Sequence, residues 1–189
     1  MIDRLKQIFD TKYSDCKNTL QKISYDKNNK ESLCNNDSIL FFDYDAIAED
    51  NYSGDTAASP DVIYFKENKI IFIEFKNGKI KSKDKRKIKI KGIEGGFLIL
   101  HKILSKEIGE CNFSDIININ KEYYIVYNRQ KNRKYPISDA QNSRIGGITK
   151  HLESREIQFG LDKYNKTFFR KVITLSGDVY YKEISKICS

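Results

Sequence analysis

The sequence predicts an α/β domain in which a mixed central sheet is flanked by helices, and three observations support this fold class. Residues 60–76 have the pattern of a β-hairpin, with two strands of β-branched and aromatic residues around a short polar turn. Apolar residues recur at helical spacing over residues 2–23 and again over residues 92–108. Residues 121–128 predict a further, central strand. With a strand expected over residues 38–47, the order is helix, strand, hairpin, helix, strand.

The register of the predicted hairpin follows from its turn. If residues 67–68 form a two-residue turn, Ile63 faces Phe72 and Asp61 faces Glu74. Side chains alternate along a strand, so Phe72 and Glu74 share one face of the sheet. The hairpin therefore brings two carboxylates to the same place at its open end.

Charged residues at the end of an apolar hairpin need a physical reason. Asp61 and Glu74 are expected to face each other, and Lys76 follows on the face of Glu74. Directly opposed Cβ atoms lie roughly 4.5–5.5 Å apart, and like charges at such positions destabilise a sheet. A divalent cation between the carboxylates would cancel the repulsion, and oxygen ligands suit Mg²⁺. The pattern predicts a metal site.

Pro60-Asp61 followed by Glu74-x-Lys76 resembles the signature of the PD-(D/E)xK nuclease superfamily, whose fold is called restriction-endonuclease-like. Other acid-x-Lys triplets occur in this chain, but Glu74-Phe75-Lys76 closes a strand and has Asp61 opposite it. The resemblance covers the hairpin and its flanks. It implies an αβββαβ core, here followed by a C-terminal helix near residues 149–161 and a β-hairpin over residues 167–184.

The resemblance implies an activity and a cofactor. The protein is expected to be a hydrolase, a Mg²⁺- or Mn²⁺-dependent endonuclease or exonuclease that breaks phosphodiester bonds in DNA or RNA. Asp61 and Glu74 would be catalytic residues and metal ligands, and the backbone carbonyl of Phe75 would be a further ligand. Lys76 would orient the attacking water or stabilise the attacked phosphate.

A third metal-facing carboxylate upstream of the hairpin is common in the family. Asp45, in the strand expected over residues 38–47, is included in the metal set. Asp43 is on the same expected face and is an equal alternative. Asp55 and Glu94 also compete for this position.

The charge of the chain favours a polyanionic partner. The formal net charge is +8, and residues 76–91 contain nine Lys or Arg residues against one acid. Such a run supplies contacts to a phosphate backbone. The predicted nucleic-acid-binding residues are Lys79, Lys81, Lys83, Lys85, Arg86, Arg129 and Arg133. The alternative function is a non-catalytic, basic nucleic-acid-binding or assembly module with a degenerate nuclease fold.

The 189 residues predict one domain over residues 1–189, with a core of about 1–128 and a C-terminal extension of about 129–189. Four scattered cysteines without a CxxC pair predict reduced thiols and no zinc site. The apolar runs are too short to span a membrane and the first residues lack a signal-peptide pattern, so we expect a cytoplasmic protein without a membrane partner. A homodimer and a cognate inhibitor protein are further partners left open.

Overall fold

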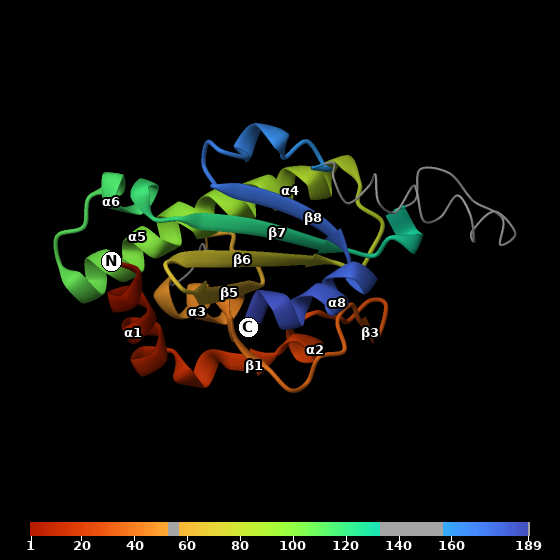
Figure 1. Ribbon diagram of the computed structural model, residues 1–189, viewed down its shortest axis with the longest axis horizontal. Coiled ribbons are helices and arrows are strands. Elements are labelled where there is room, and N and C mark those ends of the chain that lie inside the picture. Colours follow the sequence, from red (N-terminus) through yellow and green to blue (C-terminus); the bar gives the residue numbers. More distant parts are fainter. Residues whose placement is uncertain (53–56, 133–156, 189) are drawn as a thin grey trace, which may run out of the picture.

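The computed structural model describes residues 1–52, 57–132 and 157–188 of the chain. Within these residues a six-stranded sheet has the order β1-β4-β5-β6-β7-β8, and helices cover both of its faces (Figure 1). The predicted α/β class, with a mixed central sheet between helices, is confirmed.

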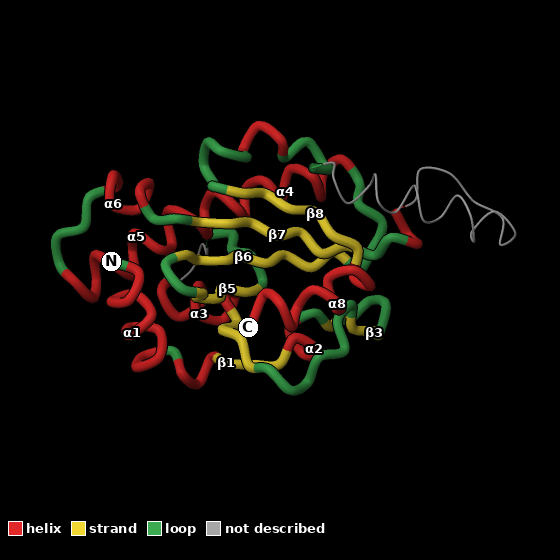
Figure 2. The backbone as a smooth tube through the Cα atoms, viewed as in Figure 1, coloured by secondary structure: helices red, strands yellow, loops and turns green. Residues whose placement is uncertain are grey.

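The strands and helices have the following bounds, and Figure 2 shows them along the backbone. The strands of the large sheet are β1 (Lys17–Thr19), β4 (Leu40–Asp43), β5 (Val62–Lys66), β6 (Lys69–Lys76), β7 (Lys121–Tyr127) and β8 (Lys171–Ser176). A separate small hairpin consists of β2 (Tyr25–Asp26) and β3 (Glu31–Ser32). The helices are α1 (Ile2–Lys12), α2 (Leu20–Ile23), α3 (Tyr44–Asn51), α4 (Ser82–Ile93), α5 (Leu100–Ile108), α6 (Phe113–Asn118) and α8 (Gly177–Cys188). A π-helical turn, η2 (Glu94–Ile99), joins α4 to α5, and η1 (Ser14–Cys16), η3 (Gln130–Asn132) and η5 (Asp162–Tyr164) are 3₁₀ turns.

Three neighbouring parallel strands have their carboxyl-terminal ends at the same end of the sheet. Strands β4, β5 and β6 are antiparallel neighbours, whereas β6, β7 and β8 run parallel. The last residues of the parallel strands, Lys76, Tyr127 and Ser176, are paired across the sheet. In Figure 1 these ends lie beside the start of α8 and the β2–β3 hairpin. Lys76 is therefore the last residue of its strand, at the end of the sheet where several loops meet.

Two hydrophobic cores lie on opposite faces of the sheet. Ile70 and Phe72 of β6 belong to the core that also contains residues of α1, α3, α4 and α5. Ile71, Ile73 and Phe75 belong to the core that α8 covers. The alternation predicted for this strand is confirmed. Because Glu74 is two residues after Phe72, both side chains point to the same face of β6, and the Glu74 carboxylate lies on the α4 side.

Two glycines allow the long helical segment α4–η2–α5 to lie close to the sheet. A Cβ atom at Gly92 would lie 2.7 Å from Cε1 of Tyr123 on β7, and one at Gly95 would overlap the ring of Pro60. The hydroxyl of Tyr44 also donates a hydrogen bond to the Gly95 carbonyl oxygen, at 2.8 Å. This close approach carries the side chains of α4 to the end of the hairpin.

The predicted N-terminal helix is too long. The helix α1 ends at Lys12, and Lys17–Thr19 forms the edge strand β1, which pairs with β4. Thr19 then caps the short helix α2 by accepting a hydrogen bond from the Lys22 N–H. The apolar residues at helical spacing in this segment do not form one helix, because residues 17–19 pair with β4 instead. Leu20 is still buried, as the first residue of α2.

The second predicted helix begins about ten residues too late. The helix α4 starts at Ser82, where the Asp84 carboxylate accepts a hydrogen bond from the Lys81 N–H at 2.9 Å. The glycines expected near the start of the helix are in its middle, where the π-helical turn lies. The basic run after the hairpin is therefore largely helical.

The strand predicted over residues 38–47 ends at Asp43. The Asp43 side chain accepts a hydrogen bond from the Ala46 N–H, at 3.2 Å, and so caps α3. Asp45 is accordingly a residue of the first helical turn and not of a strand. The expectation that Asp43 and Asp45 share a strand face is wrong.

The predicted C-terminal β-hairpin is also wrong in its second half. Lys171–Ser176 is the strand β8, but the chain continues as the helix α8, whose Tyr180 and Ile184 are buried one helical turn apart. The strand β8 pairs with β7 inside the large sheet. The helix predicted near residues 149–161 lies mostly outside the described residues, and residues 157–161 are not helical.

Candidate active site

Asp61 and Glu74 meet at the open end of the hairpin. The ladder pairs Val62 with Ile73 and Ile63 with Phe72, which confirms the predicted register and leaves Asp61 one residue beyond the last pair. One Asp61 oxygen, Oδ2, accepts a hydrogen bond from the Phe75 N–H at 2.6 Å. The contact that joins Phe75 to the site is thus its amide group, whereas its carbonyl was predicted as a metal ligand.

A cation lies between the two carboxylates, and it is the ammonium group of Lys91. Its Nζ is 3.0 Å from Asp61 Oδ1 and 3.1 Å from Glu74 Oε2. Asp45 Oδ2 is 3.8 Å from the same nitrogen. The repulsion inferred from the register is therefore balanced by a side chain of α4.

The sequence pattern does not point to Lys91, because the predicted helix begins near Gly92 and Lys91 falls in the basic run before it. A helical phase would have found it. Lys91 follows the buried Ile88 by three residues and precedes Gly92, so the three share the inward face of α4.

Glu74 is fully buried, and its environment is strongly charged. Burial, with the nearby Asp61 charge, raises the pKa of Glu74 to about 7, although Lys91 and Lys76 act in the opposite direction. Burial alone would lower the pKa of Lys91, but Asp61, Glu74 and Asp45 outweigh it and raise that pKa. Lys91 is therefore a permanent positive charge beside Glu74.

Lys76 completes the group from the end of β6. Its Nζ is 2.5 Å from Glu74 Oε1, and about a quarter of its side chain (24%) is exposed. Within the described part of the chain, Glu74 Oε1 forms no hydrogen bond of normal geometry. The ion pair with Lys76 is thus the contact that holds this oxygen of the buried carboxylate.

Among the alternatives for a third carboxylate, Asp45 is the one that contacts Lys91. It also accepts a hydrogen bond from the Ser59 hydroxyl. Glu94 instead accepts a hydrogen bond from the Ala58 N–H, at 2.6 Å, and so positions the segment before Pro60. Asp43 caps α3, and Asp55 lies outside the described residues.

A cleft of about 370 Å³ opens beside the carboxylates. Asp61, Phe75 and Lys76 line one side of it. Residues 23–26, including Tyr25, and Asn28 also line it, and Lys79 lies on the segment that leads to α4. The cleft gives the end of the hairpin access to solvent, which a reactive site requires.

One of the predicted nucleic-acid-binding residues lines this cleft, and four others follow it along the chain. Lys79 lines it, and Lys81 precedes the first residue of α4. The exposed basic residues between positions 79 and 87 are Lys79, Lys81, Lys83, Lys85, Arg86 and Lys87. Arg129 is half-buried after β7, and Arg133 lies outside the described residues.

Comparison of the chain with protein-family models, with curated proteins and with solved structures found no match. No helix among the described residues is long and apolar enough to cross a membrane.

The carboxylates have the donor chemistry of a Mg²⁺ or Mn²⁺ site, although their arrangement centres on Lys91. Over residues 1–52, 57–132 and 157–188, no three His, Cys, Asp or Glu side chains are gathered as a metal-binding group. Asp61 and Glu74 nevertheless present oxygen ligands around one positive charge, and the second Glu74 oxygen, Oε1, is paired with Lys76. These residues fit a divalent ion if Lys91 makes room for it.

Proposed function

We propose that this protein is a Mg²⁺- or Mn²⁺-dependent nuclease with a restriction-endonuclease-like αβββαβ core, formed by α1, β4, β5, β6, the α4–α5 segment and β7. One observation carries the proposal. Asp61, Glu74 and Lys76 come together at the end of the β5–β6 hairpin and beside a solvent-open cleft. The order of the elements supports the core that the Glu74-x-Lys76 resemblance implies.

In the proposed site, the carboxylates bind the metal. Asp61, Glu74 and Asp45 would hold it, with the Phe75 carbonyl as a further donor. When bound, such an ion lowers the pKa of a water ligand and neutralises charge on the attacked phosphate. Because Phe75 N–H binds one Asp61 oxygen, the carboxylate is oriented before any ligand enters.

Lys76 acts toward the substrate. Lys76 lines the cleft, its side chain is partly exposed, and its ammonium group is held near Glu74 Oε1. A phosphodiester in the cleft would meet this charge, which stabilises the additional negative charge of the transition state. Lys79 and the exposed basic residues of α4 would hold the adjoining phosphates.

The second candidate is a non-catalytic, basic nucleic-acid-binding module, and Lys91 is the observation that favours it. Its ammonium group already lies between Asp61 and Glu74, so the charges are balanced without a metal. A protein that used these residues only for stability would keep the same contacts.

Cleavage assays separate the two candidates. Purified protein is incubated with plasmid DNA, single-stranded DNA and RNA, in Mn²⁺, in Mg²⁺ or in a chelator. We expect metal-dependent cleavage of at least one substrate. Asp61→Asn and Glu74→Gln should lower its rate by about 100-fold or more, while nucleic-acid binding changes little.

Glu67→Gln is the matched control, since Glu67 is an exposed acid in the turn of the same hairpin. Its cleavage rate should equal that of the wild type. Absence of cleavage of all three substrates, together with absence of Mn²⁺ binding by calorimetry, would refute the nuclease and leave the binding module.

A further inference from the structure

We propose that the β2–β3 hairpin (residues 25–32) is a stacking subsite for one unpaired base, with Tyr25 as its platform. The proposal rests on the proposed nuclease function and names the substrate class, which is single-stranded nucleic acid or unpaired ends. It concerns a wall of the cleft that the catalytic assignment leaves unused.

Tyr25 is a large aromatic residue with a side chain exposed to solvent at the cleft. Its exposed fraction is 49%, and it lines the same cleft as Asp61 and Lys76. An aromatic face beside a basic group suits a nucleotide, because the ring stacks on the base while the cation binds the phosphate.

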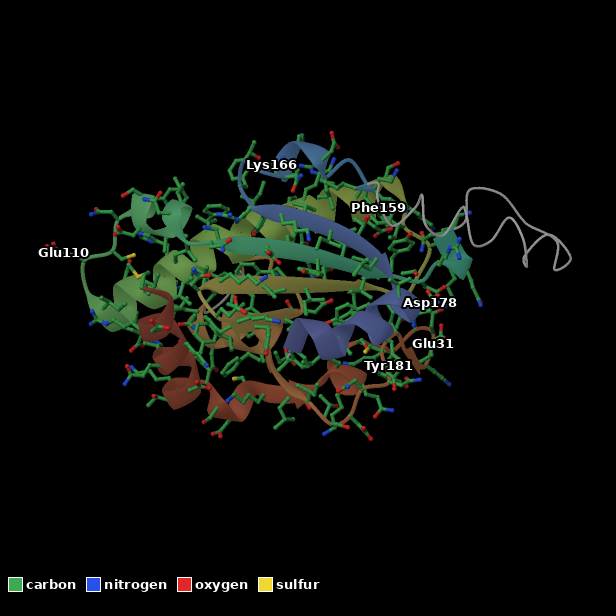
Figure 3. All side chains as sticks on the ribbon, in the orientation of Figure 1. Glu31, Glu110, Phe159, Lys166, Asp178 and Tyr181 are labelled. Atoms are coloured by element: carbon green, nitrogen blue, oxygen red, sulfur yellow. The ribbon has the colours of Figure 1, made fainter. Side chains whose placement is uncertain are left out.

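The hairpin is tied to the residue that follows the proposed catalytic lysine. Asn77 donates a hydrogen bond from Nδ2 to the Glu31 carbonyl oxygen, at 3.3 Å, and accepts one from Asn128 Nδ2, at 2.9 Å. The Glu31 carboxylate pairs with Lys131, with 2.5 Å between Nζ and Oε1. Figure 3 places Glu31 at the end of the molecule where α8 begins, near Asp178. The hairpin is thereby held in position relative to Lys76.

The acids in the cleft are occupied by nearby groups of the protein. Asp26 accepts hydrogen bonds from the N–H groups of Asn28 and Asn29, at 2.9 and 3.2 Å. Asp84 accepts the N–H of Lys81. These carboxylates stabilise the small hairpin and the start of α4. Lys76 and Lys79 remain as the cations that line the cleft, and they can meet a phosphate.

The cleft is large enough for one nucleotide. Its volume of about 370 Å³ is at the small end of the roughly 300–1,000 Å³ of ligand pockets. A base inside a duplex is covered on both faces by its neighbours, so Tyr25 could stack only on a base outside the helix. DNA and RNA share this chemistry.

The test measures binding in the Glu74→Gln background, so that the probes are not cleaved. The probes are single-stranded DNA and RNA oligonucleotides containing the fluorescent base 2-aminopurine, and a blunt DNA duplex. Tyr25→Ala should weaken single-strand binding by about tenfold and abolish the quenching of 2-aminopurine, and duplex binding should change less than twofold. Tyr25→Phe should behave as the wild type.

Tyr181→Ala is the matched control, because Tyr181 is a similarly exposed tyrosine (53%) that does not line the cleft. It should leave every probe unaffected. An equal loss on duplex and single strand, or no loss with Tyr25→Ala, would overturn the subsite. A wild-type protein that quenches 2-aminopurine through Tyr25 but cleaves nothing would support the subsite and refute the nuclease.

Discussion

Lys91 is the residue on which the chemistry of the site depends. Its ammonium group provides the positive charge that two opposed carboxylates require, and it is 21% exposed. A bound divalent ion would compete for the same oxygens of Asp61 and Glu74. Lys91 is therefore a positioning residue that holds the carboxylates of the metal-free site together. Without Lys91, the stability of the fold should depend on a bound metal ion.

Lys91→Met tests this competition. In a chelator the change leaves Asp61 and the buried Glu74 without their shared cation, and the free energy of unfolding should fall by about 3 kcal/mol. Saturating Mn²⁺ should restore most of that loss, because an ion that binds only the folded state stabilises it. Thermal unfolding with chelator and with Mn²⁺ measures both effects.

Lys87→Met is the control, because Lys87 is an exposed residue of the same helix. It should change the unfolding temperature little in either condition. If Mn²⁺ stabilises Lys91→Met no more than the wild type, the carboxylates do not form a metal site.

Glu74 should make the stability of the metal-free protein depend on pH. Its pKa rises from an ordinary value of 4.5 to about 7 in the folded state, chiefly through burial. Between these two pH values the folded state holds a proton that the unfolded state has released. The free energy of unfolding should therefore fall as the pH rises, by up to about 1.4 kcal/mol per pH unit from this group.

Urea denaturation in a chelator, at several pH values from 4.5 to 7, measures this slope. Other groups also titrate, so the informative quantity is the difference between the wild type and Glu74→Gln, which lacks the proton exchange. Glu67→Gln should retain the slope of the wild type. Equal slopes for the wild type and Glu74→Gln would show that Glu74 titrates normally.

At the level of the elements, the close packing of α4 on the sheet positions Lys91. The Tyr123 hydroxyl donates a hydrogen bond to the Ile88 carbonyl oxygen, at 2.9 Å, and the ring lies where a Cβ of Gly92 would be. The contact of Tyr123 with α4 thus fixes the distance between the helix and the sheet at Glu74.

Gly92→Ala should push α4 away from β7. The added methyl group meets the Tyr123 ring, and overpacking of this kind costs about 1–3 kcal/mol, partly offset by the higher helix propensity of alanine. We expect a net loss of about 1 kcal/mol and weaker Mn²⁺ binding, because Lys91 and the carboxylates shift. Gly78→Ala, where nothing lies within 4 Å of the new Cβ, should change neither property. A normal stability of Gly92→Ala would mean that Tyr123 moves at no cost.

The elements also show which parts of the fold can be predicted from sequence. The β5–β6 hairpin and β7 have strong local patterns, since each is a run of β-branched and aromatic residues with a clear turn or boundary. The edge strand β1 has only three residues and depends on its partner β4. The helix α8 begins inside the sequence Ser176-Gly177-Asp178, which resembles a turn, so the pattern predicts a second strand where the helix lies.

The same distinction applies to the site. Asp61, Glu74 and Lys76 were predicted because they belong to one hairpin whose register is local. Lys91 and Tyr25 come from other elements, and their places depend on how α4 and the small hairpin pack around the end of β6. No spacing within the sequence encodes those distances.

At the scale of the whole molecule, the segment after residue 157 is built into the same sheet as the site. The strand β8 pairs with β7, and Tyr180 of α8 packs on Phe75 with ring centroids 6.0 Å apart. Phe75 in turn donates its N–H to Asp61. The second core is therefore connected to the candidate active site through one residue of β6.

Ile184→Ala should show that this connection is cooperative. Ile184 is buried in the core of α8, and its truncation should lower the free energy of unfolding by about 2–5 kcal/mol. Because β8 and α8 share the sheet with β6, we expect a single unfolding transition and not an early loss of the C-terminal part. Urea denaturation followed by circular dichroism and by tyrosine fluorescence should give coincident curves. Tyr181→Ala, on the exposed side of the same helix, should change the midpoint little, whereas two separate transitions in Ile184→Ala would mean that α8 is an independent appendage.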